Sequence, residues 1–178
     1  MAASIELELD GAIARVTLVH SAKFNAFTRT MWRQLRGVFE GIQQSASVRC
    51  VVVRGADGNF CAGGDIQEYP DFRFNPETLR DFHETDVWGG LAAVLACDVP
   101  IVAQIEGFCM GAGLEIASCC DLRLADHSAR FGAPIARLGF PMAPREARLV
   151  GSAVGQTTAR AMLLAAAVFK APHMLQCG

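Results

Sequence analysis

Two glycine-rich segments contain the residues whose types and spacing could do chemistry. The first is 59–66, Asn-Phe-Cys-Ala-Gly-Gly-Asp-Ile, and the second is 107–115, Gly-Phe-Cys-Met-Gly-Ala-Gly-Leu-Glu. Each follows an apolar run that is typical of a buried strand, and ligands bind α/β proteins at the carboxyl ends of their strands. Because glycine lets the backbone approach a ligand closely, we expect the two loops to form one ligand site.

Backbone N–H groups of these loops are suited to polarise a carbonyl group. The second loop opens a predicted helix that runs through Ser118, and the first N–H groups of a helix have no intrahelical partner and favour negative charge. One N–H from each loop, converging on one oxygen, would form an oxyanion hole. Glu115 lies three residues after Ala112 on the same helix face, and its side chain leans towards the helix N-terminus. The pattern predicts a carboxylate that moves a proton beside a polarised carbonyl.

Two other interpretations of the loops stay open. They can be ordinary turns, with Glu115 as a first-turn acid that the helix dipole favours. The spacing Gly107-x3-Gly111-x-Gly113 also matches the dinucleotide loop of short-chain dehydrogenases. Against that interpretation, no acidic residue follows about 20 positions later at a strand end. The single tyrosine, Tyr69, is also followed four positions later by arginine, where those enzymes have lysine.

The elements that must position these loops alternate between strand and helix patterns, which predicts an α/β fold with parallel strands. A β-hairpin is predicted at the N-terminus, with its turn at Asp10-Gly11. The last eight residues resemble the start of another helix. The predicted strands are 5–9, 12–19, 48–53, 101–105 and 122–125. The first predicted helix has Thr28 as its N-cap and an apolar stripe that reaches Ile42, and the next spans 75–96 with Asn75 as N-cap and Pro76 at its first position. The other predicted helices are 145–154 and 157–167, besides the one that ends at Ser118.

Composition and charge limit the function classes. The 178 residues are 52% hydrophobic and 19% charged, which predicts one domain with a core, or one domain plus a fragment. A net charge of −2 gives no electrostatic reason to expect nucleic acid or a membrane surface as a partner. No apolar run approaches the roughly 20 residues of a membrane span, and the N-terminus has no signal-peptide pattern.

Cysteine usage predicts a reducing, cytoplasmic location. There are seven cysteines, an odd number, and none forms a CxxC pair. A nucleophilic cysteine would need a histidine close in space, and the four histidines show no associated motif. No spacing of His, Cys and Asp predicts a metal site, and no redox cofactor is expected.

Four segments, in order, resemble motifs of the enoyl-CoA hydratase/isomerase (crotonase) family. Residues 23–27 are similar to its KxNAL-type loop, and 60–66 to its F-x-A-G-x-D-I motif. Residues 105–121 resemble its G-x-x-x-G-x-G-x-E-x-A-x-x-x-D signature, and 131–139 match its F-G-x-P-E-x-x-x-G segment in part. The likeness covers essentially the whole chain, and the four motifs together are specific.

The resemblance implies a crotonase-like (ClpP/crotonase) spiral of ββα units. We expect residues 1–178 to form a single core domain that ends before the family's C-terminal helical trimerisation region. The implied enzyme is a lyase or isomerase of fatty acid metabolism that acts on an acyl-CoA, with coenzyme A as part of the substrate and no other cofactor. The implied assembly, where the C-terminal region is present, is a homotrimer or a dimer of trimers.

The resemblance also assigns site residues. The backbone N–H groups of Gly64 and Ala112 would be the oxyanion donors, with Glu115 as the acid/base group. Lys23 and the backbone of Ala62 would lie near the coenzyme A moiety. The other expected substrate-binding positions are Gly63, Asp65, Ile66, Gly111 and Ile135.

One departure from the family pattern affects the reaction. Hydratases of the family have a second glutamate directly after the proline of FGxP, and here that residue is Ile135, which cannot move a proton. We expect addition of water to a 2-enoyl-CoA. The alternatives are another crotonase reaction (isomerisation, decarboxylation or thioester hydrolysis) or a non-catalytic acyl-CoA-binding paralogue. Arg145 and Glu146 could supply a substitute group, and otherwise Glu146 is an exposed first-turn acid. Asp65 is expected to be a structural hydrogen-bonding group.

Overall fold

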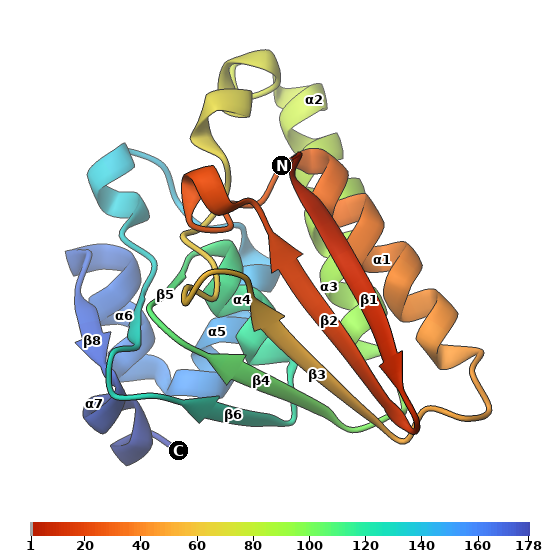
Figure 1. Cartoon of the computed structure of the whole chain (residues 1–178). Coiled ribbons are helices and arrows are strands. Elements are labelled where there is room, and N and C mark those ends of the chain that lie inside the picture. The colour runs from red at the N-terminus through yellow and green to blue at the C-terminus, as the bar shows by residue number, and fades with distance from the viewer. Residues whose placement is uncertain (1) are drawn as a thin grey trace.

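A five-stranded sheet forms the centre of the computed structural model, which describes residues 2–178. Its strand order is β1-β2-β3-β4-β6 (Figure 1). Only the β1–β2 pair is antiparallel, and the other three pairs are parallel, which confirms the predicted α/β architecture. The strands are β1 (Ser4–Asp10), β2 (Ile13–Val19), β3 (Cys50–Gly55), β4 (Ile101–Ile105) and β6 (Leu122–Ala125).

The predicted N-terminal hairpin is confirmed. Asp10 pairs with Ile13, so the turn contains Gly11 and Ala12, and Gly11 has a φ of 58°. This positive φ suits glycine and the two-residue turns that match strand twist.

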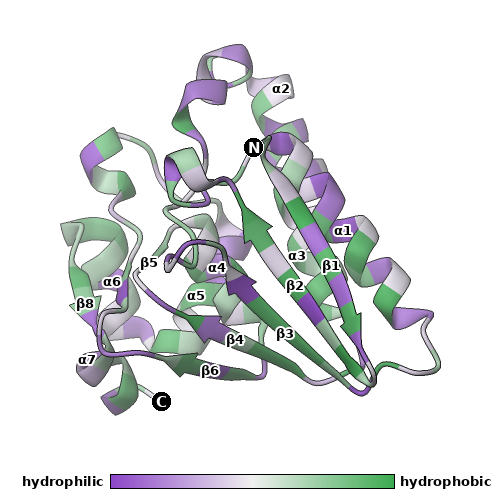
Figure 2. Cartoon of the chain, in the orientation of Figure 1, coloured by the Kyte–Doolittle hydropathy of each residue, from purple (hydrophilic) through white to green (hydrophobic). Residues whose placement is uncertain are grey.

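The inner strands bury alternate side chains, as strand geometry requires. Val51 and Val53 of β3 and Ala103 of β4 are fully buried. Figure 2 shows apolar and polar residues alternating along β1, whereas β3 is largely apolar.

Helix α1 (Arg29–Gln43) packs against β1 and against α3 (Trp88–Leu95). The Thr28 hydroxyl accepts a hydrogen bond from the Met31 N–H at 3.2 Å, which confirms the predicted N-cap. The apolar stripe predicted from the sequence is the buried face of α1, made of Met31, Trp32, Leu35, Phe39 and Ile42.

The segment predicted as one helix over 75–96 is interrupted. It consists of α2 (Pro76–Asp81), a π-helical segment over Phe82–Val87, and α3. The Asn75 side chain caps α2 and Pro76 is its first residue, as expected. The apolar periodicity does not show the π segment, because a π segment depends on contacts with other elements.

A second, smaller sheet has the order β5-β7-β8 and was not predicted. Its strands are β5 (Phe108–Met110), β7 (Arg130–Gly132) and β8 (Val168–Lys170). Three residues are too few for alternation to be recognised in a sequence. The remaining helices lie within two residues of their predicted positions and are α4 (Ala112–Cys119), α5 (Pro144–Val154), α6 (Gln156–Ala165) and α7 (Ala171–Gln176).

Within residues 2–178, no helix combines the length and the apolar character needed to cross a bilayer. All seven cysteines are free thiols, and Cys61, Cys109, Cys119 and Cys120 are buried in the core.

Candidate active site

A cavity of about 180 Å³ lies where the two glycine-rich loops meet the π segment and the start of α5. Eight of the ten residues assigned to the site from the sequence line this cavity. They are Ala62, Gly63, Gly64, Ile66, Gly111, Ala112, Glu115 and Ile135.

The first loop is held by backbone hydrogen bonds on both sides of Gly64. The Phe27 N–H donates to the Gly63 carbonyl at 2.8 Å, and the Asp65 N–H donates to the Phe27 carbonyl at 2.8 Å. These bonds leave the Gly64 N–H without a backbone acceptor among residues 2–178. Gly64 lines the cavity, and its N–H is not used by the backbone bonds that hold the loop.

The second loop leads into α4 at Gly111 and Ala112, which also line the cavity. The Gly111 N–H donates to the Gly132 carbonyl at 2.9 Å, and Gly111 adopts φ 47° and ψ −111°, which favours glycine. Ala112 is the first residue of α4, where N–H groups have no intrahelical acceptor. At Gly113, a Cβ would lie 2.8 Å from the Cys61 carbonyl oxygen, so glycine allows the two loops to pack together.

Glu115 lies on the first turn of α4, is only 8% exposed, and lines the cavity. Burial raises the pKa of its carboxyl group to about 8, and the negative charge of Glu146 contributes to the rise. No protein group among residues 2–178 donates a hydrogen bond to this carboxyl group. Glu115 is therefore mostly protonated at neutral pH and is open to the cavity.

Glu146 lines the same cavity and is only 3% exposed, so its interpretation as an exposed first-turn acid is wrong. It is the third residue of α5, two positions after Pro144. His83 of the π segment also lines the cavity, and its Nδ1 lies 3.6 Å from Glu146 Oε1. Arg145 turns away, with its Nη1 2.8 Å from Glu84 Oε2.

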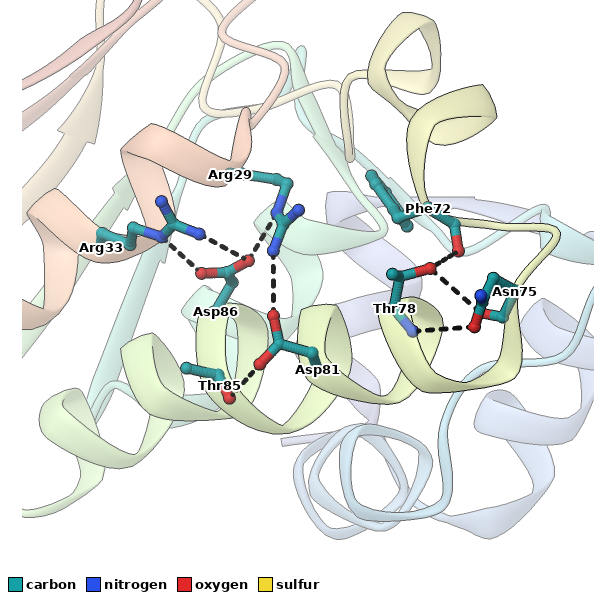
Figure 3. Close-up of polar contacts among 8 residues, drawn as sticks. All are labelled: Arg29, Arg33, Phe72, Asn75, Thr78, Asp81, Thr85 and Asp86. Carbon is teal, nitrogen blue, oxygen red and sulfur yellow. Dashed lines mark hydrogen bonds and ion pairs between the residues drawn. The ribbon is translucent and has the colours of Figure 1, made fainter.

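The π segment that carries His83 is tied to α1 through a buried carboxylate (Figure 3). Arg29 Nε and Arg33 Nε each donate to an Asp86 oxygen at 2.6 Å. Arg29 Nη2 also lies 3.2 Å from Asp81 Oδ2. Extra residues per turn re-aim side chains, and π segments are frequent at functional sites. The anchor at Asp86 fixes the turn that points His83 into the cavity.

The other two assigned residues, Lys23 and Asp65, are not part of the cavity lining. Lys23 Nζ lies 2.6 Å from Asp65 Oδ2 and also donates to Gln67 Oε1 at 2.6 Å. The Asp65 carboxylate accepts from the Gln67 N–H at 3.2 Å, which caps the short 3-10 helix Ile66–Asp71. Asp65 thus makes the structural hydrogen bonds expected of it.

Sequence reasoning missed two titratable residues of the cavity lining, Tyr69 and His83, besides several apolar ones. Tyr69 was considered only for a dinucleotide site, and burial raises the pKa of its hydroxyl to about 12. No local motif marks His83, because a π segment that the sequence does not reveal brings it to the cavity.

The buried cysteine of the first glycine-rich loop is not activated. Burial raises the pKa of the Cys61 thiol to about 12, so Cys61 remains a neutral thiol rather than a nucleophile. Within residues 2–178, no group of His, Cys, Asp and Glu is arranged to hold a metal ion.

The fold and the cavity define an α/β protein whose two glycine-rich loops meet a buried carboxyl group. A family model described as enoyl-CoA hydratase/isomerase matches residues 8–178. This chain belongs to the enoyl-CoA hydratase/isomerase family, which rules out the dinucleotide interpretation of the second loop.

Similar proteins agree with this assignment. The chain is 32% identical over 172 residues to a Mycobacterium tuberculosis protein named "Probable enoyl-CoA hydratase echA14", covering 97% of this chain and 66% of that protein. The structure of an enoyl-CoA hydratase/carnithine racemase from Magnetospirillum magneticum has a TM-score of 0.93 and 36% identity, covering 97% of this chain and 65% of that one. Pseudomonas aeruginosa AtuE has a TM-score of 0.90 and 34% identity, covering 98% of this chain and 67% of AtuE. The predicted crotonase-like fold is confirmed, and the chain spans about two thirds of the length of these relatives.

Proposed function

We propose that this chain acts on acyl-CoA thioesters and adds water to a 2-enoyl-CoA. One observation supports the proposal: Gly64 and Ala112, whose N–H groups have no backbone acceptor among residues 2–178, line one cavity together with the buried Glu115. The names of similar proteins, which include several enoyl-CoA hydratases, support the substrate class.

In this proposal the Gly64 and Ala112 N–H groups form an oxyanion hole. They donate to the thioester carbonyl oxygen as negative charge develops on it, and the start of α4 favours that charge. Preorganised donors of this kind typically contribute about 100- to 1,000-fold each to the rate.

Glu115 is proposed to donate the proton that the α-carbon receives. Its raised pKa, about 8, keeps the carboxyl group protonated at neutral pH. A general acid works best when its pKa lies near the operating pH. Polarisation of the carbonyl and proton donation beside it together convert a 2-enoyl-CoA into its hydrated product, once water attacks the β-carbon.

Hydration of crotonyl-CoA tests the proposal through the loss of the enoyl-thioester absorbance. We expect wild-type turnover, and in Glu115→Gln a loss of about 100- to 10,000-fold, because the amide cannot donate its proton as an acid. Glu106→Gln is the matched control, since Glu106 is an exposed acid in the sequence that leads into the second loop. If the wild-type protein binds crotonyl-CoA but does not hydrate it, the hydratase proposal is wrong.

Isomerisation is the second candidate, and Ile135 in the cavity lining favours it. A shift of the double bond needs one carboxyl group that removes and returns a proton, and no water has to be activated. Conversion of a 3-enoyl-CoA, followed by the gain of conjugated absorbance, would identify this reaction. Turnover of a carboxyacyl-CoA or hydrolysis of the thioester would identify the other family reactions. Binding without any turnover would identify an acyl-CoA-binding protein.

The remaining assignments are proposals about the rest of the substrate and the assembly. The coenzyme A moiety, with no further cofactor, is proposed to lie beside Lys23 and Ala62, where the 57% exposed Ile66 marks the open edge of the cavity. A trimer or a dimer of trimers is proposed for the whole protein, and light scattering would measure it.

A further inference from the structure

The cavity contains a second carboxylate at a position that the family motifs did not indicate. Hydratases of the family have a second glutamate at the position that Ile135 occupies in this chain. We propose that Glu146 takes over the role of that glutamate and accepts the proton of the attacking water. This inference rests on the proposed hydratase function and names the residue that supplies its second carboxylate.

The burial of Glu146 sets it apart from an ordinary first-turn acid. Glu77, in the first turn of α2, is exposed, as most such acids are. Glu146 is 3% exposed, yet no protein group among residues 2–178 donates a hydrogen bond to its carboxylate within 3.5 Å. Its carboxylate borders the cavity beside His83, and burying a charge is unfavourable unless it is compensated.

Glu146 lies near the start of α5, beside the other titratable groups of the cavity. It lies in the first turn of an 11-residue helix, where N–H groups and the helix dipole stabilise negative charge. The titratable side chains that line the cavity are Glu115, Glu146, His83 and Tyr69. The charge of Glu146 helps to keep Glu115 protonated, so the two carboxyl groups divide into an acid and a base.

His83 is the positioning residue for this base. Its Nδ1 is buried, has no hydrogen-bond partner within the described residues, and lies 3.6 Å from Glu146 Oε1. Hydrogen bonds of a catalytic site are often long without substrate and shorten when substrate binds. A small side-chain movement would let the Nδ1–H donate to Glu146 and orient its free oxygen towards water.

The reaction then balances within the cavity. Glu146 removes a proton from water as the water oxygen bonds to the β-carbon of the enoyl thioester. The electron pair of the double bond moves towards the carbonyl oxygen, which the Gly64 and Ala112 N–H groups stabilise. The α-carbon takes its proton from Glu115, and the proton held by Glu146 returns to Glu115 through solvent. The net change is addition of one water molecule.

Glu146→Gln measures this role directly. We expect kcat for crotonyl-CoA hydration to fall about 100-fold or more, with KM changed little, because the amide cannot accept the proton. Glu77→Gln is the control for loss of a first-turn acid and should keep wild-type kcat. Wild-type kcat in Glu146→Gln would overturn the inference and leave the hydratase function standing. Absence of hydration by the wild-type protein would overturn both.

A compensating change separates proton transfer from structure. The double variant Ile135→Glu/Glu146→Gln places a carboxylate at the motif position and removes the one on α5. We expect it to regain at least tenfold of the activity lost in Glu146→Gln, and no recovery would count against the inference. If Glu146→Gln does not fold, Glu146→Asp keeps the charge but retracts it by one methylene, and wild-type kcat there would also overturn the proposal.

Discussion

The two walls of the cavity are made in different ways. The wall formed by the glycine-rich loops and α4 contains Gly64 and Ala112, whose N–H groups are the proposed oxyanion donors. The wall formed by the π segment and the start of α5 contributes the side chains of His83 and Glu146. Main-chain donors depend on loop conformation, whereas a side-chain group needs only a backbone position within reach of the cavity.

This difference explains why one wall follows the family pattern and the other departs from it. A loop that offers an N–H requires glycine at set positions, such as Gly111 with its φ of 47° and Gly113 against Cys61. A carboxylate can be supplied from the short helix that follows Pro134 or from the start of α5, because both border the cavity. Function on this wall can move between elements without any change of fold.

The largest expected effect comes from removing a donor of the main-chain wall. Ala112→Pro deletes the N–H at the first position of α4, where proline is tolerated and no helical hydrogen bond is lost. We expect crotonyl-CoA hydration to fall about 100- to 1,000-fold with little change in thermal stability. Ala112→Ser keeps the N–H and serves as the control. Equal rates in the two variants would show that this N–H is not an oxyanion donor.

The pH dependence of kcat for hydration tests the assignment of Glu115 as the acid. Because Glu115 must be protonated and its pKa is about 8, kcat for hydration should fall about tenfold per pH unit above that value. A rate that stays constant up to pH 9.5 (about 1.5 units above that pKa) would contradict Glu115 as the acid.

The same shift makes stability depend on pH. The pKa of Glu115 is higher in the folded state than its ordinary value of 4.5, so the folded protein holds the proton more tightly. Its contribution to stability is therefore complete below about pH 4.5 and is lost as pH rises through about 8, a change on the order of a few kcal/mol. Urea unfolding across this range should show a decline in wild type that is reduced in Glu115→Gln.

The smallest expected effect comes from removing the His83 Nδ1 donor that is proposed to position Glu146. His83→Asn keeps a donor near the position of Nδ1, whereas His83→Leu removes it. We expect His83→Leu to lower kcat roughly tenfold and His83→Asn to retain most of it, consistent with one lost hydrogen bond to a charged group. Similar losses in both variants, with unchanged unfolding midpoints, would argue against a positioning role for the Nδ1 donor.

Much of the fold was predictable because it is encoded locally. The hairpin at Asp10-Gly11, the Thr28 cap and the apolar stripe of α1 each depend on neighbouring residues and on the period of a strand or helix. The small sheet of β5, β7 and β8 was missed, because its strands are short and pair only when distant segments meet.

The sequence by itself determined the α/β class, the two glycine-rich loops and the candidate role of Glu115, because these depend on residue type and short-range spacing. Only the tertiary structure decided that Glu146 is buried rather than exposed and that His83 lies beside it. The π segment, the Asp86 anchor to α1 and the packing of α4 against α5 bring these groups to one cavity. Residues 31 positions apart or more acquire a shared environment only when the chain folds, so their spacing in the sequence carries no signal of it.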